Sequence, residues 1–423
     1  MNTDRRKILL VCYYFPPLGG AGIGRPLSLF KYLPDSGFEC DILTVKPVAY
    51  RVFEPELLKR LDVSRIHRSG SHDPQRLMYL AGFRAVKDAG IRRTRGMSRR
   101  FFPDPKVGWV SPAVRLGRKL IERNKYDAII STSPPISSHL VGQKLSAECK
   151  LPWVADFRDF WTSRRIEDEF KSHRMVDKAW SLIRSIKNHP IPVSIIACSQ
   201  VISEYLGGDE VIYNSYDGNR ARLWRTPQDT KHFTIGLLGT FDEVITVEPL
   251  LKVIATLRDR QPALFEKLRL LQVGRLDSKM FRRQLETYRL IEQCDMRGFQ
   301  GRKETIAILS AASAFYIGLA SSKERGIIPG RLFDMMASGR PILAAVPNDS
   351  EIEKLLLPSG NCHCFNSDNV ASIENSADYL GRLIESQQGG RLKITPLPKY
   401  TRQYSARRMS EKFAQVLERL LQT

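Results

Sequence analysis

The chain alternates short apolar runs with helical patterns, and this alternation constrains its fold more than any other feature. The first half contains the runs KILLVCYYF, CDILTVK, YDAIIST, PWVADF and VSIIACS, separated by stretches of helical pattern. The second half repeats the pattern with FTIGLLG, LRLLQVG, AFYIGLA, PILAAVP and NCHCF. Strands that alternate with helices predict parallel sheets with crossover helices, so we predict an α/β protein of two doubly wound, Rossmann-like domains.

The chain is 423 residues long, which exceeds one ordinary hydrophobic core and favours two domains. We predict an N-terminal domain over 1–206, a polar linker over 207–232, a C-terminal domain over 233–400 and a final helix over 401–423. The apolar residues of this last segment recur at helical spacing, so we expect the helix to pack back toward the N-terminal domain. They are Met409, Phe413, Val416, Leu417 and Leu420.

Several features bear on where such a protein works. Its seven cysteines are odd in number and scattered, which does not resemble a disulfide framework and fits a reducing cytosol. The N-terminal apolar run is short, ends in PPLGG and lacks a small-residue cleavage site, so we interpret it as a first strand and not a signal peptide. The uncharged stretch 305–322 divides into a helix and a buried strand and does not suggest a membrane span. We therefore predict a cytoplasmic protein, with peripheral association at the plasma membrane as an alternative.

The net charge of +21 is concentrated in one segment. Residues 51–125 hold 19 Lys and Arg against 7 Asp and Glu, with Phe101, Phe102 and Trp109 beside the most basic part. Such a segment can bind anionic lipid, or it can be a solvated basic surface loop, and both interpretations stay open. Nucleic acid is disfavoured, because the chain has no zinc-finger spacing and no RNA-recognition signature.

Ligands of doubly wound folds bind outside the carboxyl ends of the strands, and four motifs fall there. The first is PPLGGAGIGR, directly after the first strand. Its glycines allow backbone amides to approach an anion beside a helix N-terminus. It is not the dinucleotide fingerprint, because Arg25 stands where the third glycine would fall. A tight turn without a ligand is the alternative.

The next two motifs carry the candidate catalytic residues. STSPPISSH ends in His139, which is either catalytic or an ordinary core or surface histidine. VADFRDFWT places Asp156, Arg158 and Asp159 after a strand, where charges usually pair with one another or face a site. Asp156 and Asp159 are therefore catalytic candidates, with a structural ion pair to Arg158 as the alternative.

The fourth motif, ERGIIPGRLFDMMASGRPILA, is a loop followed by a helix start. Pro329 suits the first helical turn, and the helix N-terminus attracts anions. Arg331 adds a cation with bidentate geometry, and Asp334 can accept hydrogen bonds from ribose hydroxyls. An ion pair between these two side chains on the helix surface is the alternative. Arg340 suits the end of the helix and need not touch a ligand.

These motifs resemble the family 4 glycosyltransferases of the GT-B fold, in particular the branch that assembles bacterial surface polysaccharides and lipid-linked glycans. The resemblance rests on PPLGGAGIGR, DFRDFWT, IYNSYD and above all IPGRLFDMMASGRPILA, and it spans nearly the whole chain. It implies two domains that face each other across a cleft, with a nucleotide-diphosphate sugar bound by the C-terminal domain and a glycan or polyprenyl-linked acceptor by the N-terminal one. It also implies transfer with retention of anomeric configuration, without a metal or other cofactor.

The resemblance assigns roles to particular positions. Arg331 would meet the diphosphate and Asp334 the ribose, while Asp156 or Asp159 would face the reacting centre. The remaining donor-binding candidates are Gly20, Arg25, Gly239, Arg275, Glu324, Gly326, Ile327 and Ile328.

The chain also departs from the family pattern. Many members carry two glutamates separated by seven residues, and the first would fall on Gly326. The usual Arg and Lys after the first C-terminal strand are absent, and Ser215 stands where glycine is usual. A non-catalytic protein that binds nucleotide or glycan at a membrane surface is therefore the competing interpretation. The run Cys362-His363-Cys364 has metal-ligand residue types, but alternation along a strand would point Cys and His to opposite faces, so we do not predict zinc there.

Overall fold

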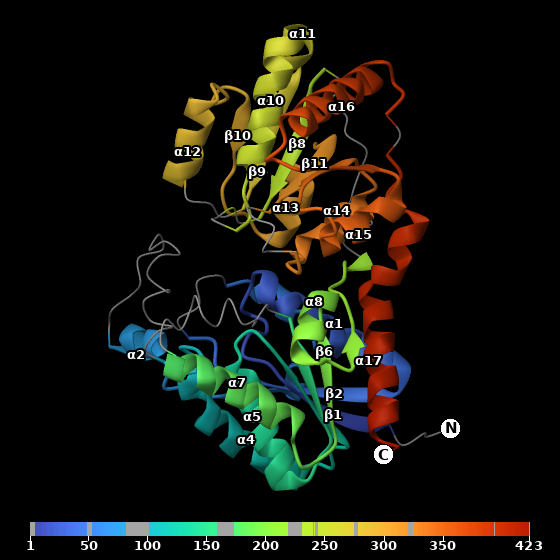
Figure 1. Ribbon diagram of the computed structural model, residues 1–423. Helices are drawn as coiled ribbons and strands as arrows, with labels where there is room; N and C mark the ends of the chain where they lie inside the picture. The colour runs from blue at the N-terminus through green and yellow to red at the C-terminus, as the bar shows by residue number, and fades with distance from the viewer. Residues whose placement is uncertain are drawn as a thin grey trace. The chain divides into compact units, whose positions relative to one another are not determined.

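The structure, a computed structural model, describes residues 5–48, 53–81, 101–158, 173–218, 231–239, 241, 244–274, 278–319, 325–392 and 394–422. The chain divides into two compact units (Figure 1). Unit 1 comprises Met1–Asn214 and Ala406–Thr423, and unit 2 comprises Ser215–Ser405. The chain thus passes from unit 1 to unit 2 between Asn214 and Ser215, inside the segment 207–232 that was expected to be a linker.

Unit 1 is built on a seven-stranded parallel sheet with the strand order β3-β2-β1-β4-β5-β6-β7. The order reverses between β1 and β4, because the chain first adds strands on one side of β1 and then on the other. The strands are β1 (Arg6–Val11), β2 (Phe38–Val45), β3 (Ile66–Ser69), β4 (Ala128–Thr132), β5 (Trp153–Phe157), β6 (Val193–Ala197) and β7 (Glu210–Val211).

Strand β1 shows why this sheet needs helices on both faces. Leu9 and Val11 belong to one buried apolar cluster, and Ile8 and Leu10 belong to another on the opposite face. The helices of unit 1 are α1 (Gly24–Tyr32), α2 (Pro74–Leu80), α4 (Val110–Arg123), α5 (Ser137–Cys149), α7 (His173–Lys187), α8 (Gln200–Leu206) and α17 (Ala406–Leu420).

The last helix, α17, packs on unit 1 beside α1, as its apolar spacing predicted (Figure 1). Met409, Phe413 and Leu417 join the same buried cluster as Ile8 and Leu10. Arg407 and Arg419 add surface ion pairs to Asp35 and Glu210 of the same unit.

Unit 2 repeats the plan with a six-stranded parallel sheet in the order β10-β9-β8-β11-β12-β13. Its strands are β8 (Phe233–Leu238), β9 (Leu268–Val273), β10 (Cys294–Met296), β11 (Ala314–Gly318), β12 (Ile342–Ala345) and β13 (Cys362–Phe365). Its helices are α10 (Glu248–Arg260), α11 (Pro262–Phe265), α12 (Ser278–Thr287), α13 (Arg302–Leu309), α14 (Arg331–Ser338), α15 (Glu351–Leu356) and α16 (Val370–Gln388). The predicted α/β fold class is thus confirmed. None of the described helices combines the length and the apolarity that a bilayer crossing requires.

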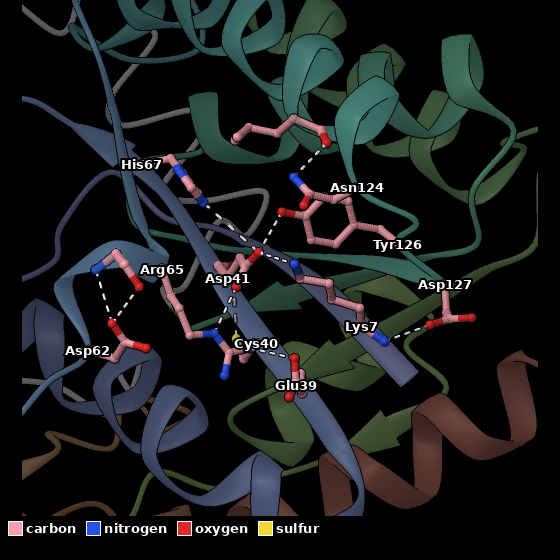
Figure 2. A network of polar contacts seen from close by, with 12 residues as sticks. Lys7, Glu39, Cys40, Asp41, Asp62, Arg65, His67, Asn124, Tyr126 and Asp127 are labelled. Atoms are coloured by element: carbon pink, nitrogen blue, oxygen red, sulfur yellow. Dashed lines mark hydrogen bonds and ion pairs between the residues drawn. The ribbon is translucent and has the colours of Figure 1, made fainter. Parts of the chain in front are cut away.

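A polar network at the amino ends of the unit 1 strands centres on the buried carboxylate of Asp41 (Figure 2). Its Oδ2 accepts hydrogen bonds from the Tyr126 hydroxyl at 2.7 Å and pairs with Lys7 Nζ at 3.0 Å. Its Oδ1 accepts from Arg65 Nε at 2.9 Å, and His67 Nε2 lies 3.9 Å from Oδ2. Burial alone would raise the pKa of Asp41, but these contacts outweigh it and hold that pKa well below its usual range.

Candidate functional site

The carboxyl edge of the unit 2 sheet contains a switch point between β8 and β11, where the strand order reverses. Open α/β sheets bind ligands outside the strand ends at such a point. Gly239 follows β8, and α14 follows the loop that leaves β11, so two parts of the predicted donor site meet at this edge.

Gly239 and Arg331 are in direct contact there. Gly239 has a φ of +96°, and a Cβ at this position would lie 2.4 Å from Nη1 of Arg331. The guanidinium carbon of Arg331 also lies 5.3 Å from the ring centroid of Phe241. The glycine turn therefore makes room for the guanidinium, and the aromatic ring holds it from another side.

A second glycine turn supports the first. Gly274 follows β9 with a φ of +137°, and a Cβ there would lie 2.3 Å from the carbonyl oxygen of Gly239. Gly274 donates its amide to the carbonyl of Gly298 at 2.8 Å, and the buried Gln272 donates to the Gly274 carbonyl at 2.9 Å. Gln272 and Gly274 were not predicted as site residues, although a glycine at the end of the run LRLLQVG is a usable signal.

Among the described residues, no side chain caps the N-terminus of α14. Gly330 is its N-cap residue, and a Cβ there would have no atom within 4 Å. The preceding loop is held by the Arg325 carbonyl, which accepts the Glu351 amide at 3.0 Å. An uncapped helix N-terminus with Arg331 in its first turn can bind an anion through backbone amides and a guanidinium.

The other donor-binding residues predicted in unit 2 divide into three groups. Asp334 lies one turn beyond Arg331 on α14 and is partly exposed. Gly326 and Ile328 are buried in the preceding loop, and Ile327 is partly exposed. Arg275 and Glu324 lie outside the described residues, so their predicted roles stay predictions.

Arg340 lies away from this site and supports another helix. It is buried and donates from Nε to the Ala312 carbonyl at 2.6 Å and from Nη2 to the Ser310 carbonyl at 2.9 Å. Ser310 is the C-cap residue of α13, so the cation meets the C-terminal carbonyls of a neighbouring helix instead of those of α14. Burial lowers the pKa of Arg340 to about 10.

In unit 1, the glycine loop after β1 lies at the other switch point. Gly20 has a φ of +96°, and a Cβ there would meet no atom within 4 Å. Arg158 holds this loop to the end of β4, because its Nη1 donates to the Gly22 carbonyl at 3.0 Å and its Nε to the Ser133 carbonyl at 2.5 Å. The sequence left open whether Arg158 pairs with the neighbouring aspartates, and it did not indicate this bracing role.

Arg25 and Asp156 pair with each other. The Nε and Nη2 atoms of Arg25 contact the two carboxylate oxygens of Asp156 at 3.0 and 2.7 Å. The Arg25 side chain is 1% exposed and that of Asp156 is 0% exposed. Arg25 also donates to the Ile212 carbonyl at 2.7 Å, and Thr132 donates to Asp156 at 2.6 Å. The two side chains thus pair within the core and stabilise the carboxyl end of the unit 1 sheet, while their predicted roles stay predictions.

His139 is also a core residue here. Its ring is fully buried, lies 4.1 Å from the Phe157 ring and has Nδ1 2.8 Å from Ser131 Oγ. Burial lowers its pKa to about 3, so the imidazole is neutral at physiological pH. This geometry fits the alternative of an ordinary core histidine. Asp159 lies outside the described residues, and its catalytic role stays a prediction.

The aromatic residues beside the basic segment differ in exposure. Trp109 is fully buried and donates its indole N–H to Ser69 at 2.8 Å, so it is unavailable to lipid. Phe102 packs partly buried against the core. Helix α2 instead carries an exposed apolar run over 77–80, in which Leu80 is 65% exposed. Residues 82–100 lie outside the described part.

Among the described residues, no group of three or more His, Cys, Asp and Glu side chains is placed to hold a metal ion. His363 turns toward α16, where it stacks on Tyr379 and contacts Ser376.

The chain is similar over its whole length to solved structures. Sucrose-phosphate synthase from Thermosynechococcus elongatus superposes with a TM-score of 0.63 at 13% identity, covering 99% of this chain and 100% of that one. The lipopolysaccharide outer core galactosyltransferase WaaB gives 0.56 at 13% identity, covering 98% and 99%. A UDP-N-acetylglucosamine 2-epimerase from Listeria monocytogenes, itself described as putative, gives 0.53 at 10% identity, covering 99% and 97%.

These likenesses define the fold as GT-B, in agreement with the sequence motifs. At such low identities they show the fold alone, and one fold serves several chemistries. No protein-family profile and no curated protein sequence matches the chain.

Proposed function

We propose that the protein is a nucleotide-sugar-dependent glycosyltransferase that transfers a sugar to a glycan or lipid-linked acceptor. The observation that carries the proposal is the contact of Arg331 with the Gly239 turn, at the switch point of unit 2 and beside the uncapped N-terminus of α14. The similarity in fold to synthases and transferases that act on sugars supports it.

In this proposal unit 2 binds the donor. The diphosphate of the nucleotide sugar accepts hydrogen bonds from the amides of α14 and from the Arg331 guanidinium, while Asp334 accepts from the ribose hydroxyls. When the sugar–phosphate bond breaks, negative charge develops on the leaving diphosphate. Arg331 and the helix terminus stabilise that charge as it forms, which is where electrostatic catalysis is most effective.

The acceptor hydroxyl then attacks the sugar on the face from which the diphosphate leaves, and its proton passes to the departing phosphate. This sequence retains the anomeric configuration and needs neither a metal ion nor a protein nucleophile. Gly20 would offer its backbone to the acceptor bound by unit 1. Asp156 and Arg25 stay structural in this scheme, because their side chains are buried and paired with each other. His139 stays structural too, because its ring is buried and its Nδ1 contacts Ser131.

A second candidate function is nucleotide or glycan binding without transfer. Two observations favour it: Gly326 stands where the family glutamate is expected, and Asp156 is committed to a buried ion pair. A binding protein and a transferase would both be stabilised by the nucleotide, so affinity alone does not separate them.

The test begins with a thermal-shift panel of UDP, GDP, ADP, TDP and CMP. We expect one diphosphate to raise the melting temperature by several degrees. The sugar conjugates of that nucleotide are then incubated with glycan and polyprenyl-linked acceptors, and the anomeric configuration of the product is determined by NMR. A product with the donor's configuration supports the proposal. Nucleotide binding without product across these acceptors supports the binding protein, and epimerised donor sugar indicates an epimerase.

We also propose that unit 1 contacts an anionic membrane through the exposed face of α2. Leu77, Met78 and Leu80 are exposed on this helix, and the segment 51–125 around it carries the local excess of 12 positive charges, 19 minus 7. Apolar side chains that enter the interface and basic side chains that attract anionic lipid act together.

Vesicle sedimentation tests the membrane contact. Binding to phosphatidylserine vesicles should fall steeply with salt and fall again in Leu77→Ser/Leu80→Ser. Val370→Ser, at an even more exposed apolar position of unit 2, is the matched control and should bind as the wild type does. If vesicle binding changes neither with salt concentration nor with the α2 substitutions, the proposed membrane contact is wrong.

A further inference from the structure

Strand β13 carries two free cysteines on one face. Cys362 and Cys364 are separated by one residue on the strand, so their side chains project to the same side of the sheet. Their backbone neighbours on β12 are Ile342 and Ala344. His363 projects to the opposite side, as expected from the alternation of a strand. The proposed glycosyl transfer uses neither thiol.

The two thiols influence each other's protonation. Hydrogen bonding with Cys364 and with Ser359 outweighs burial and lowers the pKa of Cys362 to about 7, while the same pairing and burial raise the pKa of Cys364. Cys362 is therefore the more acidic thiol of the pair and the better candidate nucleophile.

Both thiols are also partly accessible. Cys362 and Cys364 are each partly exposed, whereas Cys12, Cys40 and Cys198 are buried. β13 lies at the edge of the six-stranded sheet, so only one side of the strand is tied to a neighbouring strand. An edge strand can change its pleat and twist at less cost than a central one.

We propose that Cys362 and Cys364 form a reversible redox dithiol that reacts with low-molecular-weight disulfides such as oxidised glutathione. The Cys362 thiolate attacks one sulfur of the reagent, which releases a thiolate and leaves a mixed disulfide on Cys362. Cys364 then loses its proton and attacks the Cys362 sulfur, which releases the second thiol and closes the Cys362–Cys364 disulfide. One reagent disulfide is reduced to two thiols for each protein disulfide formed.

The geometry makes this disulfide labile. Residues two apart on a strand have Cα atoms about 6.6–6.8 Å apart, from a rise of about 3.3–3.4 Å per residue. Disulfides span Cα distances of about 4.4–6.8 Å, so closing this one draws the strand together at the upper limit. A bond under such strain is more easily reduced than a structural disulfide.

Closure would also act on the candidate donor site of unit 2. Asn361, directly before Cys362, donates from Nδ2 to the carbonyl of Gly339 at 3.0 Å, and Gly339 is the C-cap residue of α14. A change in the pleat of β13 therefore acts on the end of the helix that begins with Arg331.

Intact-mass measurement of the full chain after incubation with oxidised glutathione tests the proposal. Wild-type protein should lose two hydrogens, and peptide mapping should locate the disulfide at Cys362–Cys364. Cys364→Ser should instead accumulate one glutathione adduct on Cys362. Cys362→Ser should form an adduct on Cys364 several-fold more slowly, because an ordinary thiol is only about 3% thiolate at pH 7.

Cys149→Ser is the matched control, because Cys149 is also partly exposed but stands alone. It should close the same disulfide as the wild type. In Cys364→Ala, which removes the neighbouring thiol, the pH profile of Cys362 alkylation should move to higher pH. Three outcomes would overturn the proposal. They are equal adduct rates in Cys362→Ser and Cys364→Ser, a pH profile that Cys364→Ala does not change, and a disulfide that forms at other cysteines in folded protein.

Discussion

Replacing Asp156 by alanine separates the two roles that this residue could have. A catalytic carboxylate can be removed with little effect on folding, whereas half of a buried ion pair cannot. Asp156→Ala would leave the Arg25 guanidinium without a counterion at a site where neither side chain is more than 1% exposed. The Ile212 and Tyr213 carbonyls would still accept hydrogen bonds from Arg25, but they carry no charge to offset its desolvation.

The expected cost follows from this geometry. Removing one partner of a buried salt bridge costs about 3–5 kcal/mol, because the other charge stays buried. A domain of about 150–250 residues loses about 2–4 °C in melting temperature for each kcal/mol. Unit 1 is of this size, so Asp156→Ala should lower its melting temperature by about 6–20 °C.

Calorimetry of three variants checks the reasoning. Asp156→Ala and Arg25→Ala should both melt far below the wild type, because each leaves one buried charge. The double variant Arg25→Met/Asp156→Leu, which removes both charges and keeps the volume, should recover most of that loss. If Asp156→Ala melts as the wild type does and still abolishes turnover, the carboxylate is catalytic and the structural assignment is wrong.

Three further perturbations test other parts of the structure. Gly239→Ala should displace the Arg331 guanidinium, whose Nη1 would lie 2.4 Å from the new Cβ, and weaken nucleoside diphosphate binding by about tenfold or more in a titration. Asp41→Asn should lower stability at pH 7 by about 3 kcal/mol in urea unfolding. Because the folded-state pKa of Asp41 lies below its unfolded value of 3.8, the wild-type advantage is full above that pH and should disappear as pH falls toward the folded value. Arg340→Met should lower the melting temperature of unit 2 without changing nucleotide affinity, because the Arg340 guanidinium is buried and donates to the Ala312 and Ser310 carbonyls of the protein.

The fold was predictable because it depends on local periodicity. Most strands of the two sheets are short apolar runs, so their order follows from the sequence alone. Strands β3, β7 and β10 are short or polar and were not predicted. The packing of α17 on unit 1 followed from the spacing of Met409, Phe413 and Leu417. The strand order at the switch points then put the loops after β1, β8 and β11 at the carboxyl edges.

The pairing of charges was not predictable in the same way. Arg25 and Asp156 are 131 residues apart, and no local pattern indicates that they meet. A pair between Arg158 and the neighbouring aspartates was one interpretation of VADFRDFWT, whereas no local pattern indicated its contacts with the Gly22 and Ser133 carbonyls. Asp41 gave a usable signal, since an acid inside the apolar run CDILTVK needs partners once the strand is buried.

The candidate donor site contains one feature that was predictable from the sequence and one that was not. The position of Arg331 in the first turn of α14 was predictable, because the proline and glycines before it mark a helix start. Its contact with Gly239 and Phe241 was not, because that contact depends on β8 and β11 being neighbours in the sheet.

Calorimetric titration of the diphosphate selected by the thermal-shift panel tests the central claim most directly. Wild-type protein should bind the nucleoside diphosphate at least tenfold more tightly than Arg331→Ala and more tightly than Arg331→Lys, which keeps the charge but not the bidentate geometry. Arg260→Ala is the matched control. It removes an arginine from the C-terminal end of α10 that pairs with Asp378, and it should bind the diphosphate as the wild type does. If Arg331→Ala is folded and binds the diphosphate with unchanged affinity, Arg331 does not hold the donor and the proposed site is wrong.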